Sequence, residues 1–182
     1  QQILLSPRPG VYRNRQLLLP DYRIWSEVRY TIDGTDPRDG TPLEEPTLLT
    51  GEGSVTLRVA AVNRVDGSAV TEEITLTQDD QNSPFPESGV SAGAISLTPP
   101  GDGRYSYAIG EGRRQLLLDP LRLAPPPGNR RFLFVTIAPL GGEEAVFGHA
   151  YLLDDRRPAE PRVLLRRTGA RTLQFLAFST TD

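Results

Sequence analysis

The chain has 182 residues and a formal net charge of −3 at pH 7, and all 20 of its basic residues are arginine. Cysteine and lysine are absent, which excludes disulfides, thiolate metal sites, thiol nucleophiles and Schiff-base lysine chemistry. The arginines are spread along the chain, which argues against a nucleic-acid partner, and no apolar run approaches the roughly 20 residues that cross a bilayer.

Glycine and proline punctuate the sequence throughout. Seventeen of each lie between short apolar runs, a spacing typical of all-β proteins, and helical patterns are nearly absent. The length suits two small domains of roughly 80 to 100 residues, each able to bury a core. We therefore predict an all-β fold of two tandem immunoglobulin or fibronectin-III-like β-sandwich modules, with no cofactor.

The first module covers residues 1–84. Its clearest strand is 54–63, where Val55, Leu57, Val59 and Ala61 alternate with more polar residues and so share one face. The remaining strands of this module are expected at about residues 2–5, 16–19, 27–33, 46–49 and 70–77.

One strand of the first module runs directly into a turn. Val28, Tyr30 and Ile32 alternate, and Asp33-Gly34-Thr35-Asp36-Pro37 follows with the residues that reverse a chain. Residues 30–37 resemble the "Y-T-x-D-G-x-D-P" signature of the non-catalytic C-terminal domain of chitobiase and bacterial β-hexosaminidases, and the resemblance extends over 7–77. It implies a fibronectin-III or immunoglobulin-like domain without active-site residues, used as a spacer in secreted bacterial proteins.

Residues 78–84 break every periodicity with polar, turn-forming residues, and we interpret them as an exposed linker. A divergent second sandwich is expected over 85–160. Its strands are predicted at residues 105–109, 116–118, 121–123, 132–138 and 145–153.

The two modules look like copies of one plan. Tyr30 aligns with Tyr107, Pro46 with Pro120, and the strand 54–61 with 131–138, at a period near 75 residues. That period is too long for a solenoid and fits tandem sandwich domains.

Residues 161–182 are predicted to be either the closing hairpin of the second module or the truncated start of a third, and we favour the third copy. Leu173 and Phe175 lie on one face of the last apolar run, and Leu176 and Phe178 on the other. A strand that is apolar on both faces needs covering on both, so these four residues are a possible assembly edge.

Three patterns suggest ligand sites. Asp33, Asp36 and Asp39 invite a calcium interpretation, but their spacing does not fit an EF-hand loop, and side chains that bond backbone amides explain them better. Trp25 and Tyr22 could stack on a sugar ring as a glycan contact, although a lone Trp in a sandwich is more often in the core.

His149 is the only histidine, so any serine-type triad or mononuclear zinc site would need it. No Gly-x-Ser-x-Gly elbow or second histidine accompanies it, and we predict a histidine on a strand surface. The adjacent carboxylate pairs are interpreted as solvated charges. The sequence therefore predicts neither an enzyme nor a metal site.

The function expected from the sequence is a non-catalytic structural or assembly module of a secreted or periplasmic bacterial protein. Its partners would be proteins, namely further domains of its own chain, a homo-oligomer or an envelope assembly. The alternative is a carbohydrate-binding accessory module of a glycan-active protein. The sequence begins Gln1-Gln2 without an initiator Met, which predicts either a processed mature protein or a fragment of a longer one, and we favour removal of a signal peptide.

Overall fold

A computed structural model describes the backbone of residues 2–101, 103–156, 162–167 and 173–178, and the side chains of the first two ranges. The described elements are strands and one 3-10 helix, η1 (Pro37–Asp39), so the all-β prediction is confirmed. Among the described residues, no helix is long and apolar enough to span a membrane.

The N-terminal half (residues 2–82) is a pair of sheets. A five-stranded sheet of order β2-β8-β7-β4-β5 packs against a three-stranded sheet of order β1-β3-β6. The strands are β1 (Leu4–Ser6), β2 (Gly10–Tyr12), β3 (Leu17–Pro20), β4 (Trp25–Thr31), β5 (Thr41–Pro42), β6 (Thr47–Leu48), β7 (Gly53–Asn63) and β8 (Ala69–Gln78).

The C-terminal half (residues 83–154) repeats this plan. Its five-stranded sheet has the order β9-β15-β14-β11-β12 and packs against the pair β10-β13. Adding seven to each strand number of the first five-stranded sheet gives this order. The parallel pairing of β2 with β8 also recurs, as that of β9 with β15. The strands are β9 (Gly89–Ala92), β10 (Ile95–Leu97), β11 (Tyr105–Ile109), β12 (Gln115–Leu117), β13 (Leu121–Leu123), β14 (Arg130–Pro139) and β15 (Phe147–Asp154).

Strand register corrects one part of the internal alignment. Tyr30 pairs with Val59 and Tyr107 pairs with Ile137, so the two tyrosines are equivalent. The alignment of 54–61 with 131–138 is wrong by one residue, because it matches Val59 with the outward-facing Thr136 instead of the buried Ile137. A one-residue shift moves every side chain of a strand to the opposite face.

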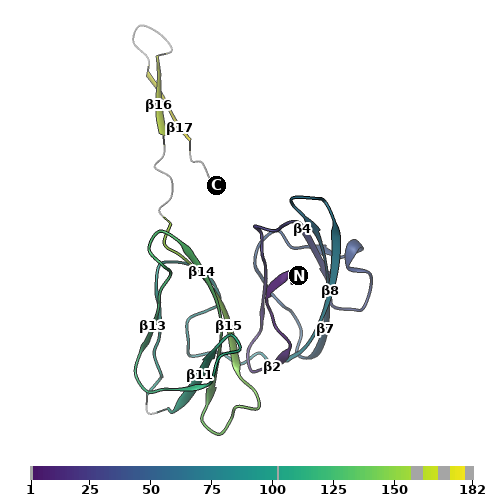
Figure 1. The fold of residues 1–182 in the computed structure, drawn as a ribbon, viewed down its shortest axis with the longest axis vertical. Helices are drawn as coiled ribbons and strands as arrows, with labels where there is room; N and C mark the ends of the chain where they lie inside the picture. Colours follow the sequence, from purple (N-terminus) through teal and green to yellow (C-terminus); the bar gives the residue numbers. More distant parts are fainter. Residues whose placement is uncertain (1, 102, 157–161, 168–172, 179–182) are drawn as a thin grey trace.

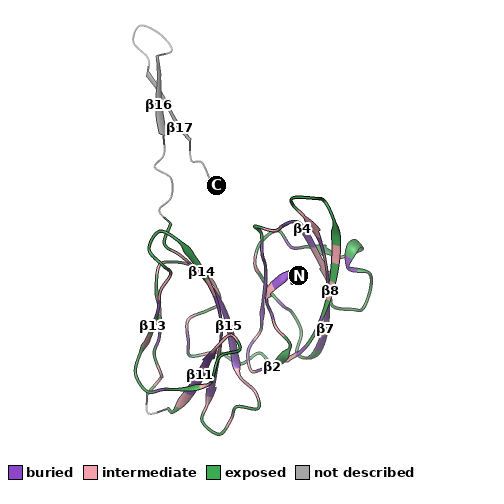
Figure 2. Cartoon of the chain, viewed as in Figure 1, coloured by how far each residue is buried: buried purple, intermediate pink, exposed green. Residues whose placement is uncertain are grey.

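The two cores are not independent. The first contains Leu18, Leu57 and Val59, but it also takes Phe134 and Ala150 from the C-terminal half. These two residues lie on the face of β14 and β15 turned away from the second core, which contains Val135. Figure 1 shows the two halves side by side, and Figure 2 shows buried positions on strands of both halves. The division at residue 84 stays a prediction.

The predicted linker makes more contacts with the rest of the chain than an exposed linker would. Gln78 is the buried last residue of β8, and Phe85 lies in the second core. The amides of Asp79 and Gln81 donate to the carbonyls of Tyr12 and Arg13, at 3.1 and 2.9 Å. The exposed-linker interpretation is therefore wrong at Gln78, whereas residues 79–82 and 84 are exposed and residue 83 is half-buried.

The last two strands, β16 (Arg162–Arg167) and β17 (Leu173–Phe178), pair antiparallel as a separate two-stranded sheet. The side chains of Leu173, Phe175, Leu176 and Phe178 lie outside the described residues. The assembly edge and the choice between a closing hairpin and a third module therefore stay predictions.

The turn after β4 has the backbone that its sequence requires. Gly34 has φ 84°, a left-handed conformation that side chains with a Cβ disfavour, and nothing lies within 4 Å of where a Cβ would stand. We expect Gly34→Val to lower the free energy of unfolding by about 1 to 2 kcal/mol through backbone strain alone. Gly34→Asn should cost less, since Asn tolerates this region. Equal urea midpoints for wild type and Gly34→Val would contradict the assignment.

Candidate functional site

The junction between the two halves begins at the free edge of β2. The amide of Val146 donates to the carbonyl of Val11 at 3.1 Å, and the amide of Arg13 donates to the carbonyl of Val146 at 2.8 Å. Together they form a parallel bridge between Tyr12 and Val146. One residue of the C-terminal half thus extends the sheet of the N-terminal half.

Arg13 binds the loop between β14 and β15. Its guanidinium donates to the carbonyl of Ala145 at 2.7 Å through Nε and to that of Gly142 at 2.9 Å through Nη2. Because one guanidinium binds two carbonyls, it fixes both the orientation of the loop and its distance from Arg13.

Asn14 pairs with the backbone of Gly148 as a neighbouring strand would. Its Nδ2 donates to the carbonyl of Gly148 at 3.0 Å, and the amide of Gly148 donates to its Oδ1 at 2.9 Å. Gln16 adds a longer bond to the same carbonyl. These polar groups are buried, and breaking one bond would leave its partner unsatisfied at a cost of about 1 to 3 kcal/mol.

The apolar part of the junction is an aromatic pair. Tyr12 meets Phe134 edge to face, with ring centroids 6.1 Å apart, and the guanidinium carbon of Arg8 lies 5.3 Å from the centre of the Phe134 ring. The hydroxyl of Tyr12 donates to the carbonyl of Arg8 at 2.8 Å, and burial raises the pKa of Tyr12 to about 12. The ring therefore stays neutral at physiological pH.

His149 lies on β15 beside this junction and is only 3% exposed, so the prediction of a surface histidine is wrong. Its Nε2 is 2.7 Å from the hydroxyl of Ser83, and its Nδ1 is 3.3 Å from that of Ser88. The imidazole stacks on Tyr151 at 5.6 Å between centroids. Burial lowers the pKa of His149 from 6.5 to about 4, so the imidazole is neutral near pH 7.

A serine and a histidine at this distance invite comparison with a nucleophile and its base. The hydroxyl of Ser83, however, also accepts from the amide of Phe85 at 3.2 Å, and Nδ1 faces Ser88 rather than the carboxylate that would stabilise an imidazolium. A histidine of such low pKa is also a weak base near neutral pH. The geometry suits a tether that fixes residues 83–88 on β15.

The internal repeat helps to explain why the burial of His149 was not predicted from the sequence. His149 pairs with Val135 as Ile74 pairs with Leu57, so a core-facing position holds isoleucine in one half and histidine in the other. Because β15 has apolar residues on both faces, its sequence does not indicate which face points into the core. Buried Gln78 had a visible signal, because it continues the inward alternation of Ile74 and Leu76.

A cleft of about 420 Å³ opens beside His149. Its lining comes from both halves, and six of the twelve lining residues carry charged or amide side chains. It is lined by Asn14, Arg15, Leu17, Leu48, Asp80, Gln81, Asn82, Ser83, Phe85, Glu87, Ser88 and His149.

The predicted aromatic pair does not form a stacking platform. Trp25 is 1% exposed and belongs to the first core, whereas Tyr22 is 36% exposed. A sugar ring cannot lie on a buried indole, so the glycan role of Trp25 is corrected to a core role. Tyr22 borders a groove of about 400 Å³. The groove is lined also by Trp25, Ser26, Glu27, Val28, Arg29, Pro42, Leu43 and Glu44.

The aspartates of the signature turn bind the backbone, as the turn interpretation predicts. Asp33 accepts from the amide of Thr35 at 3.1 Å, and Asp36 accepts from the amide of Arg38 at 2.9 Å and so caps η1. Within the described residues, no group of three histidine or acidic side chains is arranged to hold a metal ion.

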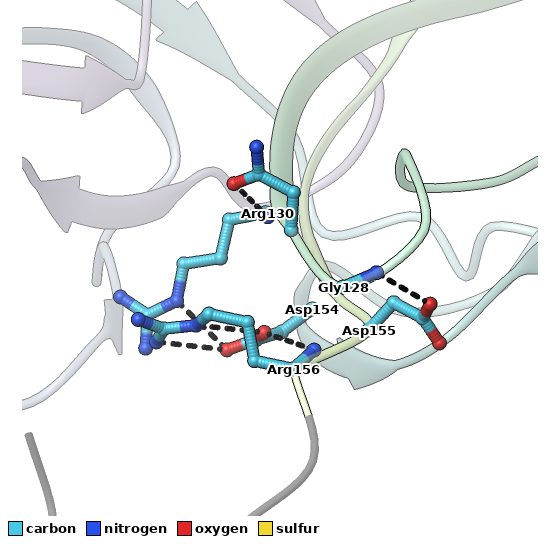
Figure 3. A network of polar contacts seen from close by, with 6 residues as sticks. Gly128, Arg130, Asp154, Asp155 and Arg156 are labelled. Atoms are coloured by element: carbon cyan, nitrogen blue, oxygen red, sulfur yellow. Dashed lines mark hydrogen bonds and ion pairs between the residues drawn. The ribbon is translucent and has the colours of Figure 1, made fainter.

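A second polar network holds the end of β15. Asp154 pairs with Arg130 at 2.7 Å and with Arg156 at 3.1 Å, and these hydrogen bonds hold its pKa well below the usual range. Asp155 accepts from the amide of Gly128 at 3.0 Å, as Figure 3 shows. The end of β15 is therefore held to the start of β14 by the ion pair between Asp154 and Arg130.

Comparisons with known proteins assign no family. No family model matches the sequence, and no curated protein matches it. Among solved structures, it is similar to the fibronectin(III)-like modules of CbhA from Clostridium thermocellum, with a TM-score of 0.30 and 12% identity over 84% of this chain and 93% of that one.

It is also similar to SGBP-B of the mixed-linkage glucan utilization locus of Bacteroides ovatus, solved with a mixed-linkage heptasaccharide. The TM-score is 0.28, with 12% identity over 84% of this chain and 47% of that one. Likenesses at these TM-scores carry no argument about function, so the functional argument below depends on the junction itself.

Proposed function

We propose that this chain is a non-catalytic structural module that acts as a rigid spacer or protein-interaction scaffold. The observation that carries the proposal is the junction, where a sheet bridge, buried amide pairs and the Tyr12–Phe134 contact hold one half against the other. A flexible linker needs none of these contacts. Burying polar groups in matched pairs specifies one orientation between the halves.

Two further points support a non-catalytic role. His149 is neutral, buried and hydrogen-bonded on both ring nitrogens. The resemblance of residues 7–77 to the chitobiase C-terminal domain also implies a spacer without active-site residues. On the same resemblance we propose a periplasmic or cell-surface location in a bacterium.

Gly148→Ala tests the rigid junction. A Cβ at Gly148 would stand 2.6 Å from Oε1 of Gln16 and 2.7 Å from the ring of Tyr12, so the substitution should force the halves apart. We expect amide ¹⁵N relaxation to give one rotational correlation time for both halves of the wild type and two in the variant.

The matched control for Gly148→Ala is Glu73→Ala. Glu73 pairs with Arg58 as Gly148 pairs with Thr136, but its side chain is exposed. The control should tumble as the wild type does. Two correlation times already in the wild type would refute the rigid spacer.

Carbohydrate binding is the second candidate, favoured by the groove beside the exposed Tyr22. One aromatic ring flanked by carboxylate and guanidinium groups can stack on a sugar and bond its hydroxyls. Calorimetric titration with chitin and peptidoglycan oligosaccharides tests it. Binding that Tyr22→Ala abolishes would favour this candidate over the spacer.

A further inference from the structure

The edges of the two five-stranded sheets are not protected equally. In the N-terminal half, β2 is covered by Val146, and β5 has two residues, one of which is Pro42 with no amide to offer. The strand equivalent to β5 is β12, which contains no proline and, among the described strands, pairs only with β11. Its outer backbone groups can accept another strand.

The β12 edge is also the more apolar one. Leu116 is 55% exposed and Leu118 73% exposed, whereas Leu117 between them is buried. Natural edge strands usually carry charge or proline at such positions, and exposed apolar edges mark sites of strand pairing. The other edge of this sheet, β9, exposes Val90 but is flanked by Glu87 with no arginine nearby in sequence.

The charges around β12 fit a second copy of the same strand. In an antiparallel pair centred on Leu116, Leu116 faces its own equivalent and Gln115 faces Leu117. Continuing the same register, Arg113 faces Asp119, and both are exposed. Two-fold symmetry repeats this opposite-charge pair on the other side of the centre. A parallel pair in register would instead set Arg113 against Arg113.

We propose that two copies of this chain associate through β12, antiparallel and centred on Leu116, so that their five-stranded sheets continue as one. The contact would bury the exposed leucines and match the charges at both ends of the paired segment. The proposal deepens the scaffold function by naming its partner, but it does not depend on a rigid junction between the halves.

Sedimentation velocity on the full chain over a range of concentrations tests the dimer. We expect a reversible dimer, and Leu116→Lys should raise its dissociation constant at least tenfold by removing apolar contact at the centre. Val65→Lys is the control, since Val65 is also exposed but lies in the turn between β7 and β8. It should leave the dissociation constant unchanged.

Charge exchange tests the register. Arg113→Asp and Asp119→Arg should each weaken the dimer about tenfold, because each sets like charges opposite one another twice per dimer. The double variant restores both pairs and should recover wild-type association. Circular dichroism would confirm that every variant is folded.

A chain that is monomeric at all concentrations would overturn the proposal, as would a dimer that Leu116→Lys leaves intact. A double variant that associates no better than the single ones would overturn it too, since the register would be wrong. None of these results would bear on the relaxation test with Gly148→Ala, which reports contact between the halves of one chain.

Discussion

Phe134→Ala is expected to lower the free energy of unfolding by about 3 to 5 kcal/mol, the usual range for removing a buried phenylalanine. The ring belongs to the first core although it comes from β14, and it meets both Tyr12 and Arg8. Its loss should therefore also uncouple the halves. Urea denaturation followed by circular dichroism should show two transitions in place of one.

Phe85→Ala is the matched control for this prediction. Phe85 is equally buried and packs edge to face on Tyr105 at 5.4 Å, but it lies within the second core. It should destabilise the C-terminal half by a similar amount without freeing the N-terminal half from the junction. If the two variants unfold alike, the Tyr12–Phe134 contact does not couple the halves.

The free energy of unfolding is expected to fall by about 3 kcal/mol between pH 7 and pH 4 because of His149 alone. Burial lowers the pKa of His149 from 6.5 to about 4, so between these values the unfolded chain binds a proton that the folded chain excludes. The stability contributed by keeping His149 neutral is therefore fully present above pH 6.5 and is lost as the pH falls towards 4. Its size is about 1.4 kcal/mol for each unit of difference between the folded and unfolded pKa.

This pH window separates His149 from the carboxylates. Hydrogen bonds to arginine lower the pKa of Asp21 and Asp154, so those groups contribute stability that is lost only at lower pH. His149→Gln keeps hydrogen-bonding capacity but does not titrate, and urea unfolding of this variant should show a much flatter profile from pH 6.5 to 4. Parallel profiles for variant and wild type would mean that His149 is accessible to protons in the folded chain.

The sequence predicted the strands whose two faces differ. In β7 the alternation of Val55, Leu57 and Val59 indicated both the strand and its buried face. The short strands β2 and β9 were not predicted, because each contains a glycine and lacks the paired leucines that marked the equally short β13, and because their pairing partners lie far along the chain. Their positions depend on tertiary contacts that no local pattern encodes.

The junction was harder to predict for a related reason. Asn14 and Gly148 are 134 residues apart, and each is ordinary in its local sequence. The available signal for the junction was the apolar character of Phe132 and Phe134, which lie on the face of β14 turned away from the second core. A strand that is apolar on both faces must be covered on both. The same reasoning predicts the assembly edge at Leu173–Phe178, whose side chains lie outside the described residues.

A distance distribution between the halves tests the rigid spacer most directly. The chain has no cysteine, so Val65→Cys and Glu111→Cys, both at exposed turn positions, would place one spin label on each half. Diluting labelled with unlabelled chain removes contributions from any dimer. Double electron–electron resonance should then give one narrow distribution for the labelled wild type and a broad one when Gly148→Ala is added. A distribution that is already broad without Gly148→Ala would contradict the account.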